Sequence, residues 1–577
     1  MTRGVSTEIR PFGDRALLVE LGSVALAHRV AAAVEAATGE AALSTADAEG
    51  PAPARWIVGA MIGFGSVVVH LDHPLADEGT PGRDGLVQWI SSVVEEARRG
   101  RLTVPPGRLV DIPVHFDGPD LDEVASETGT SAAEVVALLT GADLDVAFVG
   151  FSPGFAYLTG LAAPLDAVRR RATPRPSVPA GSVALAGGFA SIYPQSTPGG
   201  WRLVGTSSRR LFDAERPPFS LLHAVDRVRF SFAQSRAADG VLTPPATEAR
   251  LRPPLTAVGD RWIEVRRPGM LSLVQDAGRH GDAIGVPGAG PSDREALILA
   301  NRLAGNHDLD AAVECTAFGP SFRFSGNGHV AVVGPTGTEA DIDVDIDGRP
   351  CPAGTLVPVD AGQTLSLGRV RTGLRAYLAV SGGLRTPELF GSRSTDQLSG
   401  LGPGALQAGD RLALGPPGQP RGRLTGPRPT VLGQDPSVLR VLAGPHRLPP
   451  PAWDRLVSAG WTVDAASNRI GLRLRSDGDQ LPAGEGTIDS IGLVTGAIQV
   501  PPDGRPIILG PDHATVGGYP VIGCVISADL SALGQLAPGN VIGFTEVDTH
   551  LARLAWEQRE RALDRQVSGW FPTATGP

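Results

Sequence analysis

The stretch Thr197-Pro-Gly-Gly-Trp201-Arg-Leu-Val-Gly205 recurs 318 residues later as Thr515-Val-Gly-Gly-Tyr519-Pro-Val-Ile-Gly523. Both copies read Thr, any residue, two Gly, an aromatic residue, any residue, two aliphatic residues and Gly. Repetition over this distance indicates duplicated domains. A Gly-Gly pair that enters a strand lets the backbone pass close to a ligand or to another strand. The repeat therefore predicts two equivalent β units, whose glycines form either β-bulges or ligand-facing segments.

The composition describes a globular chain built of many short elements. At 577 residues, the length suggests roughly three to five domains. With 74 Gly and 51 Pro, short strands joined by turns are favoured over a helical bundle. The net charge of −10 argues against a surface that binds nucleic acid or anionic membranes.

The chain contains no lysine, because all 51 basic residues are arginine. This excludes a Walker A lysine, a Schiff-base lysine and covalent biotin on this chain. Phosphate or carboxylate groups must then be bound by Arg or by backbone N–H groups. The scattered Cys315, Cys351 and Cys524 form neither a disulfide framework nor a metal motif. The first residues do not resemble a signal peptide and no long apolar run follows, so we expect a cytoplasmic location.

The pattern of apolar residues and turns predicts a mainly β fold with α+β character. A small α/β sandwich precedes three β units, and Pro/Gly-rich stretches separate them. The predicted domains are 1–103 (α/β), 104–232 (β), 233–258 (linker), 259–420 (β) and 421–577 (β with a C-terminal helix).

Helix signals support this division. A capping box of Ser131 and Glu134 predicts a short helix in the first β unit. Ser292 and Glu295 predict a second capping box, for a helix over 293–304 that ends before Gly305. The remaining expected helices span 24–37, 86–99, 121–127 and 550–566.

Two sets of motifs resemble a known pair of protein families. Val149-Gly-Phe-Ser-Pro-Gly-Phe-Ala-Tyr-Leu158 and Thr173-Pro-Arg-Pro-Ser-Val-Pro-Ala-Gly-Ser182 resemble allophanate hydrolase subunit 1, also called the B subunit of 5-oxoprolinase. Val274-Gln-Asp-Ala-Gly-Arg-His-Gly281, Ser467-Asn-Arg-Ile-Gly471 and Gly496-Ala-Ile-Gln-Val-Pro501 resemble allophanate hydrolase subunit 2, or the C subunit of 5-oxoprolinase. The chain is thus similar to both subunits fused head to tail, and to the carboxyltransferase domains of urea amidolyase.

The resemblance implies a fold and three alternative functions. It implies a small α/β domain and three cyclophilin-like β-barrels. In bacterial 5-oxoprolinase, such subunits act with a LamB/YcsF-type A subunit; together they hydrolyse ATP and open 5-oxoproline to glutamate. ATP is then a co-substrate, with Mg²⁺ bound mainly through its phosphate oxygens. The alternatives are a carboxyltransferase component of a biotin-dependent urea carboxylase system, and a non-catalytic, kinase-inhibitor-like regulatory module. A homo-oligomer is compatible with each.

The chain departs from the family pattern at three positions. Leu139 stands where subunit 1 proteins often have His, and Ala514 and Val516 replace Gln and Thr of the subunit 2 pattern. If the lost polar groups bind substrate, the substrate or the activity differs.

We take candidate site residues from these motifs. An enzyme that opens a lactam with ATP must bind anionic groups and activate water, so we look for residues that can do either. We expect catalytic roles for Asp512, His513 and Asp276. For substrate or ATP binding we expect Arg175, Gly187, Gly188, Tyr193, Gly199, Gly200, Trp201, Arg279, Asn468, Arg469, Gln499, Gly517, Gly518 and Tyr519. Further candidates are the cation Arg302 and the acids Asp293 and Asp396. No cluster has the spacing of metal ligands.

Each candidate also has a purely structural interpretation. The arginines are expected to form salt bridges, Asp276 and Arg279 to pair within one loop, and the aromatic residues to pack in a barrel core. We expect the site in a cleft between the first-half barrel and a second-half barrel, because fusion holds the two halves together.

Overall fold

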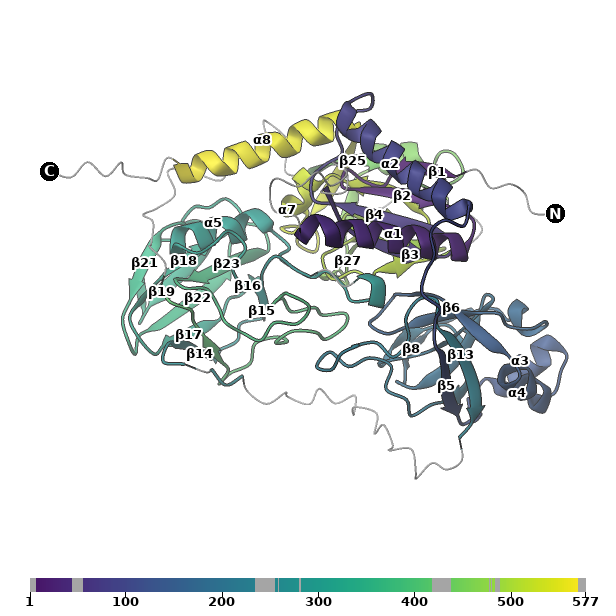
Figure 1. The fold of residues 1–577 in the computed structure, drawn as a ribbon. Coiled ribbons are helices and arrows are strands. Elements are labelled where there is room, and N and C mark those ends of the chain that lie inside the picture. Colours follow the sequence, from purple (N-terminus) through teal and green to yellow (C-terminus); the bar gives the residue numbers. More distant parts are fainter. Residues whose placement is uncertain are drawn as a thin grey trace.

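The computed structural model describes residues 7–43, 56–233, 255–257, 259–279, 282–417, 437–476, 478, 480–482 and 488–568. The predicted linker 233–258 therefore lies almost wholly outside the described residues. The chain is mainly β, as predicted, with several sheets and one closed seven-stranded barrel. The N-terminal sheet and the last barrel lie side by side, and the other two β units lie on different sides of this pair (Figure 1).

The N-terminal region forms an antiparallel sheet of order β1-β2-β4-β3. Two helices cover one face of this sheet, and alternate residues of β2 point to opposite faces. Leu17 and Val19 pack under the helices, whereas Ala16 and Leu18 contribute to a separate core on the other face. Both faces of the sheet are therefore buried. The elements are β1 (Glu8–Pro11), β2 (Ala16–Glu20), α1 (Val24–Leu43), β3 (Ile57–Gly63), β4 (Ser66–Leu71) and α2 (Pro81–Arg98).

The next unit is a seven-stranded sheet of order β12-β9-β10-β7-β6-β13-β5. Its outer strands are joined by a bridge between His115 and Thr206, and β5 pairs in parallel with β13. The predicted capping box of Ser131 and Glu134 is confirmed at the start of α4. The elements are β5 (Leu109–Val114), α3 (Leu121–Thr128), α4 (Ala132–Thr140), β6 (Asp143–Val149), β7 (Ala156–Thr159), η2 (Leu165–Ala167), β8 (Arg175–Val178), β9 (Ser182–Ala186), β10 (Phe189–Ile192), β11 (Thr197–Gly199), β12 (Arg202–Thr206) and β13 (Arg227–Phe232).

The third unit consists of a six-stranded sheet, β20-β19-β22-β17-β14-β24, and a five-stranded sheet, β15-β16-β23-β18-β21. A single apolar core draws residues from both sheets. The elements are β14 (Trp262–Arg267), β15 (Leu271–Gln275), η3 (Asp282–Ile284), α5 (Arg294–Ala304), β16 (Ala312–Thr316), β17 (Ser321–Phe324), β18 (Gly328–Val333), β19 (Ile342–Ile346), β20 (Arg349–Pro350), β21 (Leu356–Val359), β22 (Thr364–Val370), β23 (Arg375–Val380) and β24 (Arg411–Ala413).

The predicted capping box of Ser292 and Glu295 is wrong. The N-cap of α5 is Asp293, whose side chain accepts a hydrogen bond from the backbone N–H of Ala296. The backbone N–H and the hydroxyl of Ser292 instead donate to Glu314 on β16. Ser292 therefore does not cap α5, because it is hydrogen-bonded to a carboxylate from another strand.

The last unit is a closed barrel of order β25-β32-β29-β30-β27-β26-β33, in which β25 pairs in parallel with β33. The long helix α8 follows it and crosses from the N-terminal domain to α5 (Figure 1). Arg553 of α8 binds Asp77, and Arg559 binds Glu295. The elements are β25 (Val438–Ala443), α6 (Ala452–Ser458), β26 (Trp461–Val463), β27 (Gly471–Arg475), β28 (Ile491–Gly492), β29 (Ala497–Gln499), β30 (Ile507–Leu509), β31 (Val516–Gly517), β32 (Val521–Val525), η4 (Ser527–Asp529), α7 (Leu530–Leu533), β33 (Val541–Glu546) and α8 (Thr549–Ser568).

The two copies of the repeated motif occupy equivalent places. The first copy forms β11 and β12, and the second forms β31 and β32. In each case the first strand pairs in a small two-stranded sheet, with β8 or β28, and the second strand lies beside β9 or β29. The register of β11 shifts between Thr197 and Gly199, as in a β-bulge. The repeated motif therefore occupies the same structural position in two β units.

One apolar core joins three regions of the chain. It contains Leu18 of the N-terminal sheet, Phe148 and Trp201 of the second unit, and Ile491 and Val516 of the last unit. The two halves of the chain therefore share part of their interior, and the apolar contact between them comes from residues far apart in the sequence.

Candidate functional site

A cavity of about 940 Å³ lies where the N-terminal domain, the third unit and the closed barrel meet. Four of the predicted site residues line it: Arg279, Asn468, Arg469 and His513. No residue of 104–232 does so. The cavity therefore differs from the expected cleft between two barrels, because the N-terminal sheet, and not the first-half barrel, forms its third wall.

Arg469 lies at the centre of a buried ion-pair network behind this cavity. Its Nε and Nη2 donate to the two carboxylate oxygens of Asp512, at 2.9 and 2.8 Å. Its Nη1 donates to Glu314 Oε1 at 2.6 Å and to Ser292 Oγ at 2.7 Å. Its Nη2 also donates to the backbone oxygen of Gly290 at 2.6 Å. All five donors of the guanidinium are thus used within the protein.

The charges of this network balance each other. Burial alone would lower the pKa of Arg469, but Glu314 and Asp512 outweigh it and raise the pKa. Burial likewise opposes ionisation of Glu314, but Arg469 and Arg375 lower its pKa below the usual range. Asp512 is fully buried and also accepts from the backbone N–H of Gln397. Arg469 therefore has no free donor to offer a substrate, and three hydrogen bonds already occupy the Asp512 carboxylate.

Arg279 is buried in a different way. Its side chain is only 3% exposed, and its Nη2 donates to the backbone oxygen of Ser394. Its Nε and Nη1 have no hydrogen-bond partner among the described residues. Burial lowers its pKa, whereas the nearby charges of Asp396, Asp276 and Asp512 raise it. A buried guanidinium with two unused nitrogens is costly unless something else binds it.

Asp276 does not form the expected salt bridge with Arg279 in the described structure. Its Oδ1 accepts from the hydroxyls of Ser392 and Ser394, and its Oδ2 accepts from the backbone N–H of Arg393. The carboxylate thus holds the 392–394 segment against its own loop. Asp276 reaches Arg279 indirectly, because Ser394 also binds Arg279.

Asp396 is a second incompletely paired group near Arg279. Its Oδ1 accepts from the backbone N–H and the hydroxyl of Ser399, but its Oδ2 has no partner among the described residues. Burial and the neighbouring charge of Asp512 raise the pKa of Asp396 to about 6. This carboxyl therefore changes its charge close to neutral pH.

His513 and Thr515 bring the second copy of the repeat to the cavity wall. The imidazole Nδ1 of His513 lies 2.7 Å from the backbone oxygen of Ala514. The Thr515 side chain is 2% exposed, and its hydroxyl has no hydrogen-bond partner among the described residues. Both residues line the cavity, although Gly517, Gly518 and Tyr519 do not.

The predicted residues of the first half form structural contacts. Arg175 binds both carboxylate oxygens of Asp120, at 2.8 and 2.9 Å. Gly187 and Gly188 form the two-residue turn between β9 and β10, with φ of +57° and +81°. A turn of this kind requires φ above zero at both central residues, so the turn itself accounts for the Gly-Gly pair.

The first copy of the Gly-Gly motif is shaped by aromatic packing. A Cβ on Gly199 would lie 2.4 Å from the hydroxyl oxygen of Tyr193, and one on Gly200 would touch Pro174. Tyr193 and Trp201 each pack edge-on against Phe155, with ring centroids 5.2 and 5.6 Å away. Burial raises the pKa of Tyr193 to about 12. The lack of a side chain at Gly199 therefore makes room for Tyr193 of the same unit, and not for a ligand in the cavity.

The second copy has different neighbours. A Cβ on Gly517 would lie 2.8 Å from Gln499 Nε2, which has no hydrogen-bond partner among the described residues. A Cβ on Gly518 would approach the backbone oxygen of Ile488 at 3.2 Å. Tyr519 is partly exposed. Two predicted residues, Gln499 and Gly517, thus do lie together, but outside the cavity lining.

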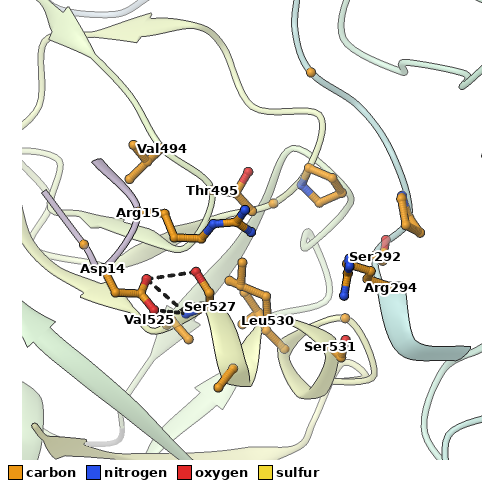
Figure 2. A pocket seen from close by; sticks show the side chains of 18 of the residues that line it. Asp14, Arg15, Ser292, Arg294, Val494, Thr495, Val525, Ser527, Leu530 and Ser531 are labelled. Carbon is orange, nitrogen blue, oxygen red and sulfur yellow. Dashed lines mark hydrogen bonds between the residues drawn. The ribbon is translucent and has the colours of Figure 1, made fainter. Parts of the chain in front are cut away.

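The N-terminal wall of the cavity was not among the predicted site residues (Figure 2). There Asp14 accepts hydrogen bonds from the backbone N–H and the hydroxyl of Ser527, at 3.0 and 2.9 Å. The Arg15 guanidinium lies 4.9 Å from the ring centroid of Trp556 on α8, and Arg294 lies 5.5 Å from the same ring. The only local signal is the polar pair Asp14-Arg15 directly before a buried strand.

Two absences concern the described residues alone. Within them, no group of three or more His, Cys, Asp or Glu side chains is arranged to hold a metal ion. In the same part of the chain, every helix is too short or too polar to cross a membrane.

Two family models match the chain. The model described as "Carboxyltransferase domain, subdomain C and D" matches residues 7–222, and "Carboxyltransferase domain, subdomain A and B" matches residues 284–546. The fold is also similar to that in the crystal structure of TTHA0988, with a TM-score of 0.76 and 32% sequence identity. That similarity covers 92% of this chain and 100% of the other.

Curated relatives match the two halves separately. The C subunit of 5-oxoprolinase from Escherichia coli (strain K12) is 34% identical over 309 residues, which cover 52% of this chain and 97% of the relative. The B subunit of 5-oxoprolinase from Bacillus subtilis (strain 168) is 44% identical over 126 residues, which cover 21% of this chain and 52% of the relative. The chain belongs to the carboxyltransferase-domain family of 5-oxoprolinase subunits, with a half that is similar to the B subunit fused in front of a half that is similar to the C subunit.

Proposed function

We propose that the chain is the fused B–C component of an ATP-dependent 5-oxoprolinase in the cytoplasm. It opens 5-oxoproline to glutamate together with a separate LamB/YcsF-type A subunit. The observation that carries this proposal is that both subunit-like halves occur in one chain and supply walls of one cavity. The units at 104–232, 259–420 and 421–577 act in it as three cyclophilin-like barrels.

The chemistry of the cavity suits an amide substrate. Opening a lactam requires activation of a resonance-stabilised carbonyl and delivery of water, for which ATP supplies a phosphoryl group. His513 lines the cavity and is our candidate for proton transfer. Arg279 and Asn468 line the same cavity and are our candidates for substrate binding. Asp512 and Asp276 act as positioning residues, because Arg469 and the 392–394 segment already occupy their carboxylates.

A reconstituted reaction tests the proposal. Full-length protein, a purified LamB/YcsF-type A subunit, ATP with Mg²⁺ and 5-oxoproline are expected to release glutamate, and omission of any one component to abolish release. His513→Gln is expected to lower kcat by about 100-fold, in line with the loss of an acid–base group. His329→Gln, on β18 and outside the cavity lining, serves as the control. Absence of glutamate from the complete mixture would reject the proposal.

A second candidate function is carboxyl transfer with biotin-bearing partner proteins. The observation that favours it is the description of both matching family models as carboxyltransferase domains. The chain has no lysine, so biotin would have to arrive on a partner. Specific capture of a biotinylated partner from the source cells, and carboxylation of urea by the reconstituted pair, would favour this function over lactam opening.

A further inference from the structure

The long helix α8 forms one wall of the cavity. Five of its residues line the cavity, and all five lie between Trp556 and Arg561. The helix begins at Thr549, beyond the last residue that either family model matches, and it bridges from the N-terminal domain to α5 of the third unit (Figure 1). We call its residues 556–568 the C-terminal arm.

The N-terminal half of α8 is fixed by apolar packing and by an ion pair. Ala552 and Ala555 share a buried apolar cluster with Ile526 of the last unit. Arg553 binds Asp77 of the N-terminal domain at 2.8 Å. Because these contacts come from two different units, this half of the helix stays in place without help from the C-terminal arm.

The C-terminal arm is attached mainly by charged groups. Of the side chains described in 556–566, Leu563 alone is buried, and it packs in one cluster with α5. Ion pairs join Arg559 and Glu560 to the first turn of α5. Ion pairs near the surface stabilise a structure only weakly, because water and salt screen them. One leucine and a few such pairs therefore hold the arm less firmly than apolar packing holds the rest of the helix.

The other walls of the cavity are joined by buried contacts. Arg469 of the last unit binds Glu314 of the third unit inside the protein. Arg375 of the third unit is also buried, and it binds the backbone oxygen of Gly534 in the last unit. These contacts hold the two units together, so the C-terminal arm is the part of the cavity wall that can move with the least loss of contacts.

We propose that the C-terminal arm is a releasable lid, which detaches from α5 at a hinge near Ala555 and admits small molecules to the cavity. The N-terminal half of α8 stays docked while the lid is open. Release uncovers Arg15, whose guanidinium lies 4.9 Å from the ring centroid of Trp556 in the closed arrangement. The lid goes beyond the proposed function, since its opening requires neither ATP, 5-oxoproline nor the A subunit.

Hydrogen exchange of the full-length protein, followed by mass spectrometry, tests the release. Leu563→Ala removes the buried side chain of the arm, and we expect the amides of 556–562 to exchange together, about tenfold faster or more. NaCl at about 1 M is expected to speed the same amides and to leave those of α5 unchanged, because it screens the ion pairs. Leu551→Ala is the matched control, since Leu551 is an exposed leucine of the same helix.

Labelling of arginines with phenylglyoxal, mapped by mass spectrometry, tests whether release opens the cavity. In Leu563→Ala, the labelling of Arg15 is expected to rise severalfold, because Trp556 no longer covers its guanidinium. The labelling of Arg469 is expected to stay unchanged, because the network around its guanidinium does not depend on the arm.

Each outcome decides the proposal. Faster exchange of 556–562 with Leu563→Ala but not with Leu551→Ala, together with stronger labelling of Arg15, supports the lid. Equal effects of the two variants, or an equal rise of exchange in α5, overturn it, because the arm would then not open as a separate element. Faster exchange without stronger labelling of Arg15 also overturns it, since the released arm would not uncover the cavity. Failure of glutamate release in the reconstituted reaction would reject the proposed function and leave the lid untouched.

Discussion

Arg469 and Arg279 are two arginines that are buried to a similar extent but differ in how completely their guanidinium groups are hydrogen-bonded. Arg469 is 2% exposed and uses all five donors, with Glu314 and Asp512 as its main acceptors. Arg279 is 3% exposed and, among the described residues, uses only Nη2. Burial alone therefore does not mark a functional arginine. The completeness of its hydrogen bonding distinguishes a structural network from a binding group.

The largest expected effect comes from breaking the complete network. Arg469→Met leaves the buried Glu314 and Asp512 without their shared counter-ion, so we expect a loss of about 3–5 kcal/mol in the free energy of unfolding. Urea denaturation followed by tryptophan fluorescence measures it. The double variant Arg469→Met, Asp512→Asn is expected to recover part of the loss, because residue 512 then carries no charge and Glu314 keeps Arg375 as a counter-ion. An unchanged urea midpoint in the single variant would show that the network is not structural.

Asp396→Asn is expected to stabilise the protein above pH 6, by about 1–3 kcal/mol. The pKa of Asp396 is raised from 3.8 to about 6 by burial and by Asp512. The folded state therefore binds this proton more tightly than the unfolded state does. The resulting stability is fully present below about pH 4 and is lost as the pH rises through 6.

Thermal unfolding from pH 4 to pH 8 checks this sign. The difference between Asp396→Asn and the unmodified protein should grow with pH and level off above pH 6. Ser399→Ala removes the hydroxyl that binds Asp396 Oδ1, and should shift the transition to higher pH. A difference that is largest at pH 4 would contradict the interpretation of Asp396 as an incompletely paired acid.

Arg175→Gln should have a smaller effect, of about 1 kcal/mol. Its partner Asp120 keeps Arg171 and the backbone N–H of Leu203 as donors, at 3.0 and 2.7 Å. The Asp120 carboxylate therefore keeps an arginine, as Glu314 keeps Arg375 at 3.4 Å, whereas Asp512 has no second ion pair within the described residues. Urea denaturation of the two variants side by side measures the contrast. A loss as large as that of Arg469→Met would show that a second arginine beside the carboxylate does not reduce the cost of losing the first.

Thr515→Val should change the free energy of unfolding by less than about 0.5 kcal/mol, or raise it slightly. The hydroxyl has no partner within the described chain, so its removal breaks no bond there. Ser191→Ala is the matched control, because the buried Ser191 hydroxyl donates to the Ala156 backbone oxygen at 2.7 Å, and we expect it to cost about 1 kcal/mol. Equal losses from both variants would indicate that Thr515 is hydrogen-bonded in the folded protein.

Local patterns predicted local structure well. The helix signals located α3, α4 and α5 to within one or two residues, and the capping box at Ser131 was confirmed. The capping box at Ser292 failed because Glu314 and Arg469, from other elements, bind that serine. A pattern of four residues contains no information about such long-range competitors.

The candidate site was predictable only in part. Four of the candidate residues, Arg279, Asn468, Arg469 and His513, line one cavity, and their roles stay predictions. The motifs did not distinguish the incompletely hydrogen-bonded Arg279 from the fully hydrogen-bonded Arg469. The partners that make this difference, Ser394 for Arg279 and Asp512 for Arg469, lie far from these arginines in the sequence. The N-terminal wall around Asp14 and Arg15 was missed, since its partner Ser527 lies 513 residues further along the chain.

The apolar core shared by the first and last units has a consequence for synthesis of the protein. Val68 of the N-terminal sheet and Ile491 of the last barrel belong to this core, and 423 residues separate them. At about 5–20 residues per second, the ribosome needs roughly 20–85 s to cover that interval. During this interval, the part of the sheet face that β28 covers stays exposed, although the second unit has already been made, so we expect the nascent chain to bind chaperones.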